Sequence, residues 1–170
     1  MMEYSEFLEK TNTNLKNAKY RISTVEKLPD SAQIDLLASK TYFSWKGFVI
    51  LSQHFLISYI ENPTLQDEQD LFDHGFKLGK KINRIPLLRG MQFGYMIIPI
   101  IVTKNVEESL LSYVTNTPRK HFSIFEFPVI VDLEKNQIHY FKKTAIWGAL
   151  FFSDMRKTVS KYIENVLLSS

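Results

Sequence analysis

The spacing of apolar residues changes near residue 90, and this change constrains the fold more than any other feature of the chain. Before it, apolar side chains recur every three or four residues, which is the spacing of an amphipathic helix. After it, β-branched runs of strand length alternate with shorter helical patterns. The sequence therefore predicts an α+β fold in a single domain over residues 1–170, with a helical sublayer over about residues 1–88 and a β-α-β-β-α sublayer over about residues 91–168.

Three helices are predicted for the N-terminal part. The first covers residues 3–27 and ends before Pro29, because proline cannot continue a helix. A second runs from Ser31 to about Ile60, and a third over about residues 66–81 begins with acidic side chains that favour the positive end of the helix dipole. The first two helices form a hairpin. Because a long amphipathic hairpin often completes its core with a symmetric copy, we expect a homodimer through these helices.

A small mixed sheet is predicted for the C-terminal part. The run from Phe93 to Thr103 is apolar on both faces, as expected for a covered strand, and Pro99 indicates an edge position or a bulge. It is followed by a short helix, two strands with a polar connection, and a closing helix, over about residues 105–116, 122–131, 138–141 and from 144 onward. A strand-helix-strand crossover would make the first two strands parallel.

Composition excludes several functional classes. The chain has no cysteine, so disulfides, thiolate nucleophiles and cysteine-ligated metals are excluded. The acidic N-terminus lacks the basic and apolar regions of a signal peptide, and the longest apolar runs are far shorter than the roughly 20 residues that span a bilayer. We therefore expect a cytoplasmic protein with no membrane partner, and no cofactor or bound metal is predicted.

Charge is unevenly distributed along the chain. Residues 1–73 carry a net charge of −4 and residues 74–170 a net charge of +7, which indicates an anionic ligand or nucleic acid as a partner of the basic part. The alternative is that the two parts pack against each other. The candidate ligand-binding residues are Lys77, Lys80, Lys81, Arg84, Arg89, Arg119 and Arg156.

The candidate catalytic residues lie around the expected hairpin, and they are Glu126, Asp132, Glu134 and His139. Two carboxylates with an imidazole can hold a divalent ion or pair an acid with a base, although hairpin turns are also polar for solubility. Glu126 and Asp132 are about 20 Å apart on a regular strand, too far to share one ion unaided. Arg156 can reach back to pair with Glu126 or Asp132. Nuclease, serine hydrolase and phosphate-loop motifs fail on spacing or context.

These patterns favour a non-catalytic binding or interaction module with a basic face for an anionic ligand. The alternative is a metal-dependent hydrolase or nuclease-like enzyme that acts on a phosphate-bearing substrate. The two hypotheses differ in one respect that the fold decides. An enzyme of this kind needs its acidic residues in one cavity with displaced pKa values, whereas a binding module needs convergent basic residues.

Overall fold

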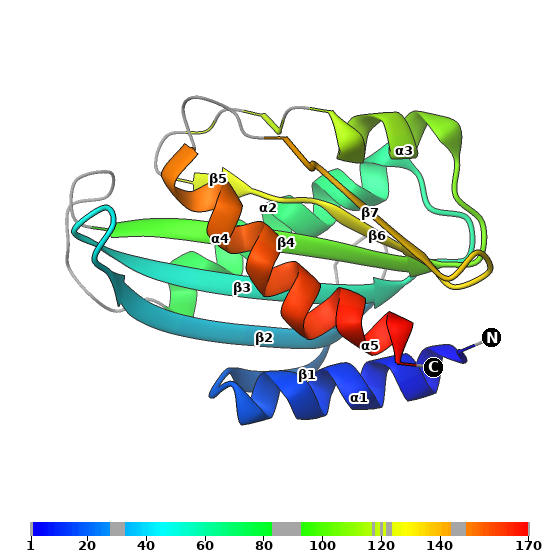
Figure 1. The fold of residues 1–170 in the computed structure, drawn as a ribbon, viewed down its shortest axis with the longest axis horizontal. Coiled ribbons are helices and arrows are strands. Elements are labelled where there is room, and N and C mark those ends of the chain that lie inside the picture. Colours follow the sequence, from blue (N-terminus) through cyan, green and yellow to red (C-terminus); the bar gives the residue numbers. More distant parts are fainter. Residues whose placement is uncertain are drawn as a thin grey trace.

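The chain folds into three layers, with one mixed sheet between two layers of helices (Figure 1). The computed structural model describes residues 2–27, 33–82, 93–116, 118–119, 121, 124–143 and 149–169. In chain order the elements are α1 (Tyr4–Asn17), β1 (Arg21–Lys27), β2 (Gln33–Ser44), β3 (Val49–Tyr59), α2 (Leu65–Ile82), β4 (Phe93–Thr103), α3 (Glu108–Thr115), β5 (Ile124–Glu126), β6 (Val129–Asp132), β7 (Gln137–Tyr140), α4 (Ala149–Val159), the π-helical turn η2 (Ser160–Glu164) and α5 (Asn165–Leu168).

The sheet has seven strands in the order β1-β2-β3-β4-β6-β7, with β5 also paired to β4. The first three strands form an antiparallel meander. Strand β4 is parallel to β3, β5 and β6, and β7 closes the edge antiparallel to β6. The crossover through α3 is therefore parallel, as expected from the sequence. The parallel strands β3, β4 and β6 have their C-terminal ends on the same side of the sheet. The turn between β2 and β3 lies at the opposite ends of these strands.

Alternating side chains of the central strands build two separate cores. On β4, Met96 and Ile98 pack with α1, α4 and α5, whereas Tyr95 and Ile97 pack with α2 and α3. All eleven residues of β4 are buried, because each face of the sheet is covered by helices. This double covering explains why the strand is apolar along nearly its whole length.

The predicted helical hairpin is wrong. Only residues 4–17 of its first helix are helical, and its second helix is replaced by the β2–β3 hairpin. Lys19, with φ of 63°, turns the chain out of α1 and into β1. The expected helical sublayer over residues 1–88 thus supplies three of the seven strands. The surface through which we expected a homodimer does not exist in the form that the sequence indicated.

The other predicted elements are confirmed, with shifted boundaries. The α+β class, the helices α2 and α3, the strand β4, the two later strands and the closing helix all appear, although the expected strand over 122–131 is divided into β5 and β6. In the described part of the chain, no helix is both long enough and apolar enough to cross a membrane.

Pro99 is neither at a sheet edge nor in a bulge of β4. It pairs with Leu56 in the middle of the sheet. The Ile97 carbonyl accepts from the Phe127 amide at 3.0 Å, so Pro99, two residues later, directs its nitrogen to the same side. That side is where β5 ends at Glu126 and β6 has not yet begun. Pro99 therefore faces the gap between β5 and β6, where none of the described strands pairs with β4 on that side. Its missing N–H costs the sheet no backbone hydrogen bond.

Candidate functional site

A cluster of buried polar side chains lies between the sheet and the helices α2 and α3. At its centre is Glu126 of β5, whose side chain is fully buried. Arg119 donates from Nη2 to Oε1 at 2.9 Å and from Nε to Oε2 at 3.2 Å. The Tyr113 hydroxyl donates to Oε1 at 2.7 Å, and His121 Nε2 lies 2.7 Å from Oε2. These contacts supply the charged and hydrogen-bonding partners that a buried carboxylate requires.

A second carboxyl group, that of Glu68 on α2, completes this buried carboxylate cluster. Glu68 is 1% exposed, and neither of its oxygens has a hydrogen-bond partner among the described residues. Burial, followed by the charge of Glu126, raises the pKa of Glu68 from 4.5 to about 8, against the opposing charge of Arg119. At pH 7 Glu68 is thus mostly a neutral carboxylic acid.

The solvent-facing side of the cluster is formed by Arg119 and His121, whose side chains are 41% and 25% exposed. The ring of Phe72 stacks on His121 with centroids 4.8 Å apart, and Arg119 lies over the same ring. Neither Glu68 nor Glu126 lines any of the cavities described below. We therefore interpret the cluster as a buried charge network that joins α2 and α3 to the sheet.

The structure separates Glu126 from the other candidate catalytic residues. Asp132 is buried at the end of β6, where Oδ1 accepts the backbone N–H of Lys135 at 2.9 Å and thereby closes the hairpin turn. Glu134 is exposed in that turn. His139 lies on β7 opposite Ile130, and burial lowers its pKa. In the described residues, no group of three or more histidine and acidic side chains is arranged to hold a metal ion.

The candidate basic residues do not converge on one face. Lys77, Lys80 and Lys81 lie on α2, behind the sheet in Figure 1, whereas Arg156 lies on α4 in front of it. The guanidinium of Arg156 donates to the backbone carbonyl of Lys143, so the expected pairing with Glu126 or Asp132 is wrong. Arg119 is bonded to Glu126, and Arg84 and Arg89 lie outside the described residues.

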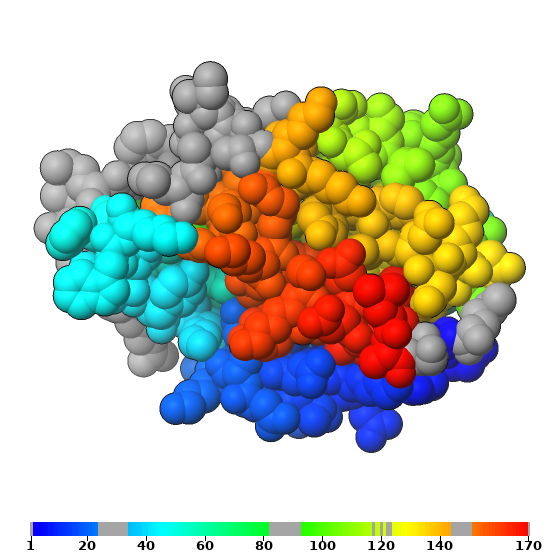
Figure 2. All heavy atoms as spheres, viewed as in Figure 1, coloured from blue at the N-terminus to red at the C-terminus, as the bar shows by residue number. Residues whose placement is uncertain are grey.

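A different set of cationic and aromatic side chains does converge, on the α4 face. They line a cavity of about 410 Å³ between α4 and the strands β2 and β3, on the side of the molecule seen in Figures 1 and 2. We call it the tyrosine pocket, and its lining residues are Tyr20, Lys40, Tyr42, Gln53, Asp154, Lys157, Thr158 and Tyr162. This volume is in the range of small-molecule sites.

Unused hydrogen-bond donors face the tyrosine pocket. Gln53 is 2% exposed, and its Oε1 accepts from the Tyr20 hydroxyl at 2.7 Å, but its Nε2 has no partner among the described residues. Lys40 uses one of its three donors on the Ala18 carbonyl at 2.9 Å. Lys157 is exposed and makes no ion pair with a described residue. The base and the rim of the pocket therefore both present N–H groups.

The electrostatics of the tyrosine pocket favour an anion. Its one acidic residue, Asp154, is paired with Lys46 at 2.6 Å, so the charges of Lys40 and Lys157 are left in excess. Burial raises the pKa values of Tyr20 and Tyr42, which keeps both phenols protonated at neutral pH. The pocket thus combines positive charge, hydroxyl groups and aromatic walls.

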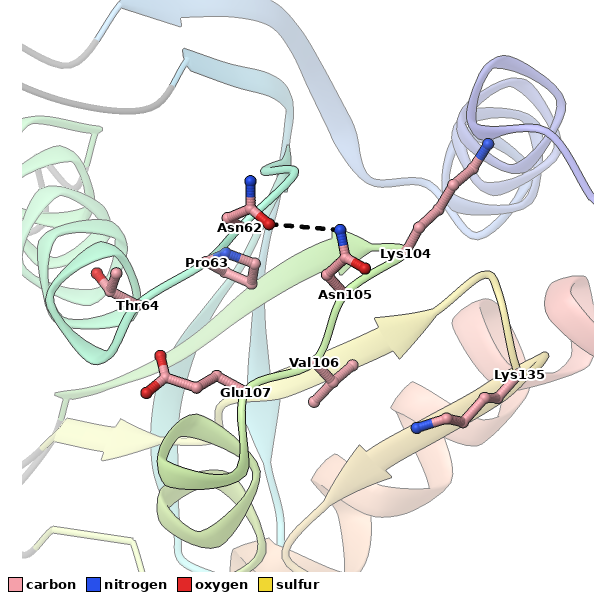
Figure 3. A pocket seen from close by; sticks show the side chains of 8 residues that line it. All are labelled: Asn62, Pro63, Thr64, Lys104, Asn105, Val106, Glu107 and Lys135. Atoms are coloured by element: carbon pink, nitrogen blue, oxygen red, sulfur yellow. Dashed lines mark hydrogen bonds between the residues drawn. The ribbon is translucent and has the colours of Figure 1, made fainter.

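A larger cavity, of about 580 Å³, lies where the parallel strands end, a common ligand position in sheets of this kind (Figure 3). Several of its polar groups already have partners within the protein. The Asn105 amide donates to Asn62 Oδ1 at 3.4 Å, and Lys104 points away toward Glu3, 3.8 Å distant. Lys135 lies 3.7 Å from Asp132. The lining of this cavity includes the Glu107 carboxylate and lacks the aromatic walls of the tyrosine pocket.

No family model, curated protein or solved structure matches the chain significantly.

The tyrosine pocket was missed at the level of sequence because its residues are scattered over 143 positions. Lys40, Tyr42 and Gln53 fall in the segment that was assigned to a helix, so their common face was assigned wrongly. If residues 33–44 are read as a strand, Ala38, Lys40 and Tyr42 fall on one face, because every second side chain of a strand points the same way. That reading places Lys40 and Tyr42 side by side.

Proposed function

We propose that the protein is a binding module for a small anionic ligand, which the tyrosine pocket holds. The observation that carries the proposal is the buried Gln53 amide, whose Nε2 has no partner among the described residues and lines a pocket with Lys40 and Lys157. Solvent in the pocket can reach this N–H group, so an acceptor atom of a ligand can take the hydrogen bond in place of water. Phosphate and carboxylate groups supply such acceptors together with negative charge.

The aromatic walls indicate a ligand with a ring beside its anionic group. Tyr20 and Tyr162 meet edge to face, with centroids 6.0 Å apart, and Lys40 lies over the Tyr20 ring. A flat apolar group can pack against these rings while its anionic end reaches Gln53 and the lysines. A pocket of about 410 Å³ accommodates a molecule of one or two rings, which favours a small ligand over a polymer such as nucleic acid.

The first test uses phenyl phosphate, with inorganic phosphate and phenol as probes that each lack one half of it. Titrations are followed by ¹H–¹⁵N correlation spectra, in which the Gln53 side-chain amide reports directly on the pocket. We expect phenyl phosphate to shift this resonance and to bind about tenfold more tightly than either partial probe, because only it uses both the rings and the cations. If none of the probes shifts the resonance, the proposal fails.

Matched lysine variants test the role of charge. Lys40→Gln and Lys157→Gln are each expected to weaken phenyl phosphate binding about five- to tenfold, since each removes one charge-assisted contact. Lys77→Gln is the control, because it removes an equal charge from the exposed surface of α2 on the other side of the sheet. Equal effects of all three variants would mean that binding reflects net charge and would contradict a site in the pocket.

A further inference from the structure

Three large aromatic side chains are exposed together at the turn between β2 and β3. Phe43, Trp45 and Phe48 are 45%, 76% and 74% exposed. Their rings contact one another, with centroids 4.8 Å apart for Phe43 and Trp45 and 6.2 Å apart for Trp45 and Phe48. We call these three residues the aromatic tip. Single exposed apolar residues are common on protein surfaces, but a contiguous group of large aromatics marks an interaction site.

The aromatic tip is held firmly by the body of the protein. A side chain at Gly47 would begin 2.8 Å from the Phe151 ring of α4, so glycine lets the turn approach the helix closely. Lys46 pairs with Asp154 of α4 at 2.6 Å. Phe48 has φ of 48°, a left-handed conformation that is uncommon for a bulky residue. The turn is therefore fixed in a conformation that leaves its aromatic rings in water.

The aromatic tip projects at one end of the long axis of the molecule (Figures 1 and 2). Strands β3 and β4 both begin at this end, with Ile50 opposite Phe93. Because α2 runs from the end of β3 back toward the start of β4, its last turn lies at the same end. The tip and the last turn of α2 therefore share one end of the molecule.

The charges at the helix termini are sorted along the same axis. The last turn of α2, at the end that bears the tip, carries Lys80 and Lys81, while its first turn at the opposite end carries Asp67. Helices α1 and α3 also begin at that opposite end, with Glu6 and Glu108 in their first turns. The aromatic tip therefore lies at the end where α2 presents its two lysines, which we call the basic end and which complements an anionic surface.

We propose that the aromatic tip docks the protein on an anionic lipid bilayer, with Trp45 and Phe48 entering the interfacial region and the basic end facing the lipid headgroups. Tryptophan and other aromatic side chains favour the boundary between headgroups and acyl chains, and lysines near the surface are attracted to anionic lipid. A second copy of this chain is a poorer occupant, because a symmetric contact through the tip would bring the lysines at the end of α2 in both copies close together.

This inference differs from the expectation that the protein has no membrane partner. That expectation rested on the shortness of the apolar runs, and interfacial docking requires no spanning segment. It does not depend on the tyrosine pocket, because the residues of the tip and of the pocket are different. The two proposals can therefore fail separately.

The test is flotation of the full chain with vesicles of phosphatidylcholine alone or with about one-third phosphatidylserine. We expect the wild type to float with the anionic vesicles at low salt and to bind the neutral ones at least about tenfold more weakly. The double variant Trp45→Ser with Phe48→Ser is expected to lose about tenfold or more in binding to anionic vesicles, because it removes the inserted rings.

Leu168→Ser is the matched control for lost apolar surface, since Leu168 is 64% exposed on α5, far from the tip. This variant should bind as the wild type does. Lys80→Gln with Lys81→Gln should weaken binding to anionic vesicles, whereas Lys135→Gln, in the hairpin at the opposite end, should not. A Trp147→Phe variant leaves Trp45 as the sole tryptophan, and its fluorescence should shift to shorter wavelength on binding.

Two results would overturn the proposal. One is a wild-type protein that does not bind anionic vesicles at low salt. The other is undiminished binding by the double tip variant, with circular dichroism confirming that it is folded. If vesicle binding depended on Lys40 and Lys157 and not on the tip, the lipid headgroup would be a ligand of the tyrosine pocket, and docking through the tip would be excluded.

Discussion

Replacing Arg119 with methionine is expected to lower the free energy of unfolding by roughly 2–3 kcal/mol at pH 7, because it removes the cation that faces a buried carboxylate. Glu126 is fully buried and receives both Nε and Nη2 of Arg119. Removing one partner of a fully buried pair costs about 3–5 kcal/mol, and we expect less because Arg119 is 41% exposed and water can replace part of its contact. Urea denaturation followed by circular dichroism measures the change.

A double-mutant cycle with Glu126→Gln separates charge from packing. If charge dominates, Arg119→Met should cost much less in the Glu126→Gln background, because no buried charge is left uncompensated. Arg119 also lies over the rings of Phe72 and Tyr113, at 5.6 Å and 5.7 Å from their centroids. An equal cost in both backgrounds would mean that Arg119 stabilises the protein through these ring contacts and not through Glu126.

The second half of the fold was predictable because its local patterns agree with its tertiary surroundings. Helix α2 begins with acidic residues and ends with lysines, as a helix dipole favours, and Asp67 closes its N-terminus by hydrogen bonding to Thr64. Strand β4 is rich in β-branched residues and too short for a membrane span. In both elements, composition and periodicity indicate the same structure.

The N-terminal half was misassigned because strands covered on both faces lack an alternating pattern. From Leu51 to Ser58 every residue of β3 is buried, and such a run can be mistaken for the buried part of a helix. The signals that favour strands were present. Lys46-Gly47 marks a turn in the middle of the supposed helix, and Val49 and Ile50 are β-branched residues that resume immediately after it.

The candidate sites were less predictable than the fold, because each joins residues from elements that only tertiary packing brings together. The tyrosine pocket takes Gln53 from the centre of the sheet and Lys157 from the last long helix. The acidic run that includes Glu68 predicts only a favourable helix start, whereas the structure buries Glu68 near Glu126 of β5. Sequence can indicate which residues carry charge, but not which of those charges are removed from water.

The burial of Glu68 predicts the second large effect, a strong dependence of stability on pH. Above pH 4.5 the unfolded chain loses the Glu68 proton, while the folded protein retains it until about pH 8. Folding must therefore take up a proton in this window, and the free energy of unfolding falls as pH rises from 4.5 to 8. The decrease from this one group is about 3 kcal/mol by pH 7 and roughly 4–5 kcal/mol above pH 8.

Glu68→Gln removes this dependence, because a neutral amide cannot lose a proton. The variant should match the wild type near pH 4, where Glu68 is protonated in both states, and exceed it by about 3 kcal/mol at pH 7. Urea denaturation at pH 4, 7 and 9 measures the difference, with Glu108→Gln as the exposed control from the first turn of α3. If the free energies of unfolding of Glu68→Gln and the wild type differed by the same amount at all three pH values, the pKa of Glu68 would be the same in the folded and the unfolded protein. In that case the neutral acid beside Glu126 would not exist.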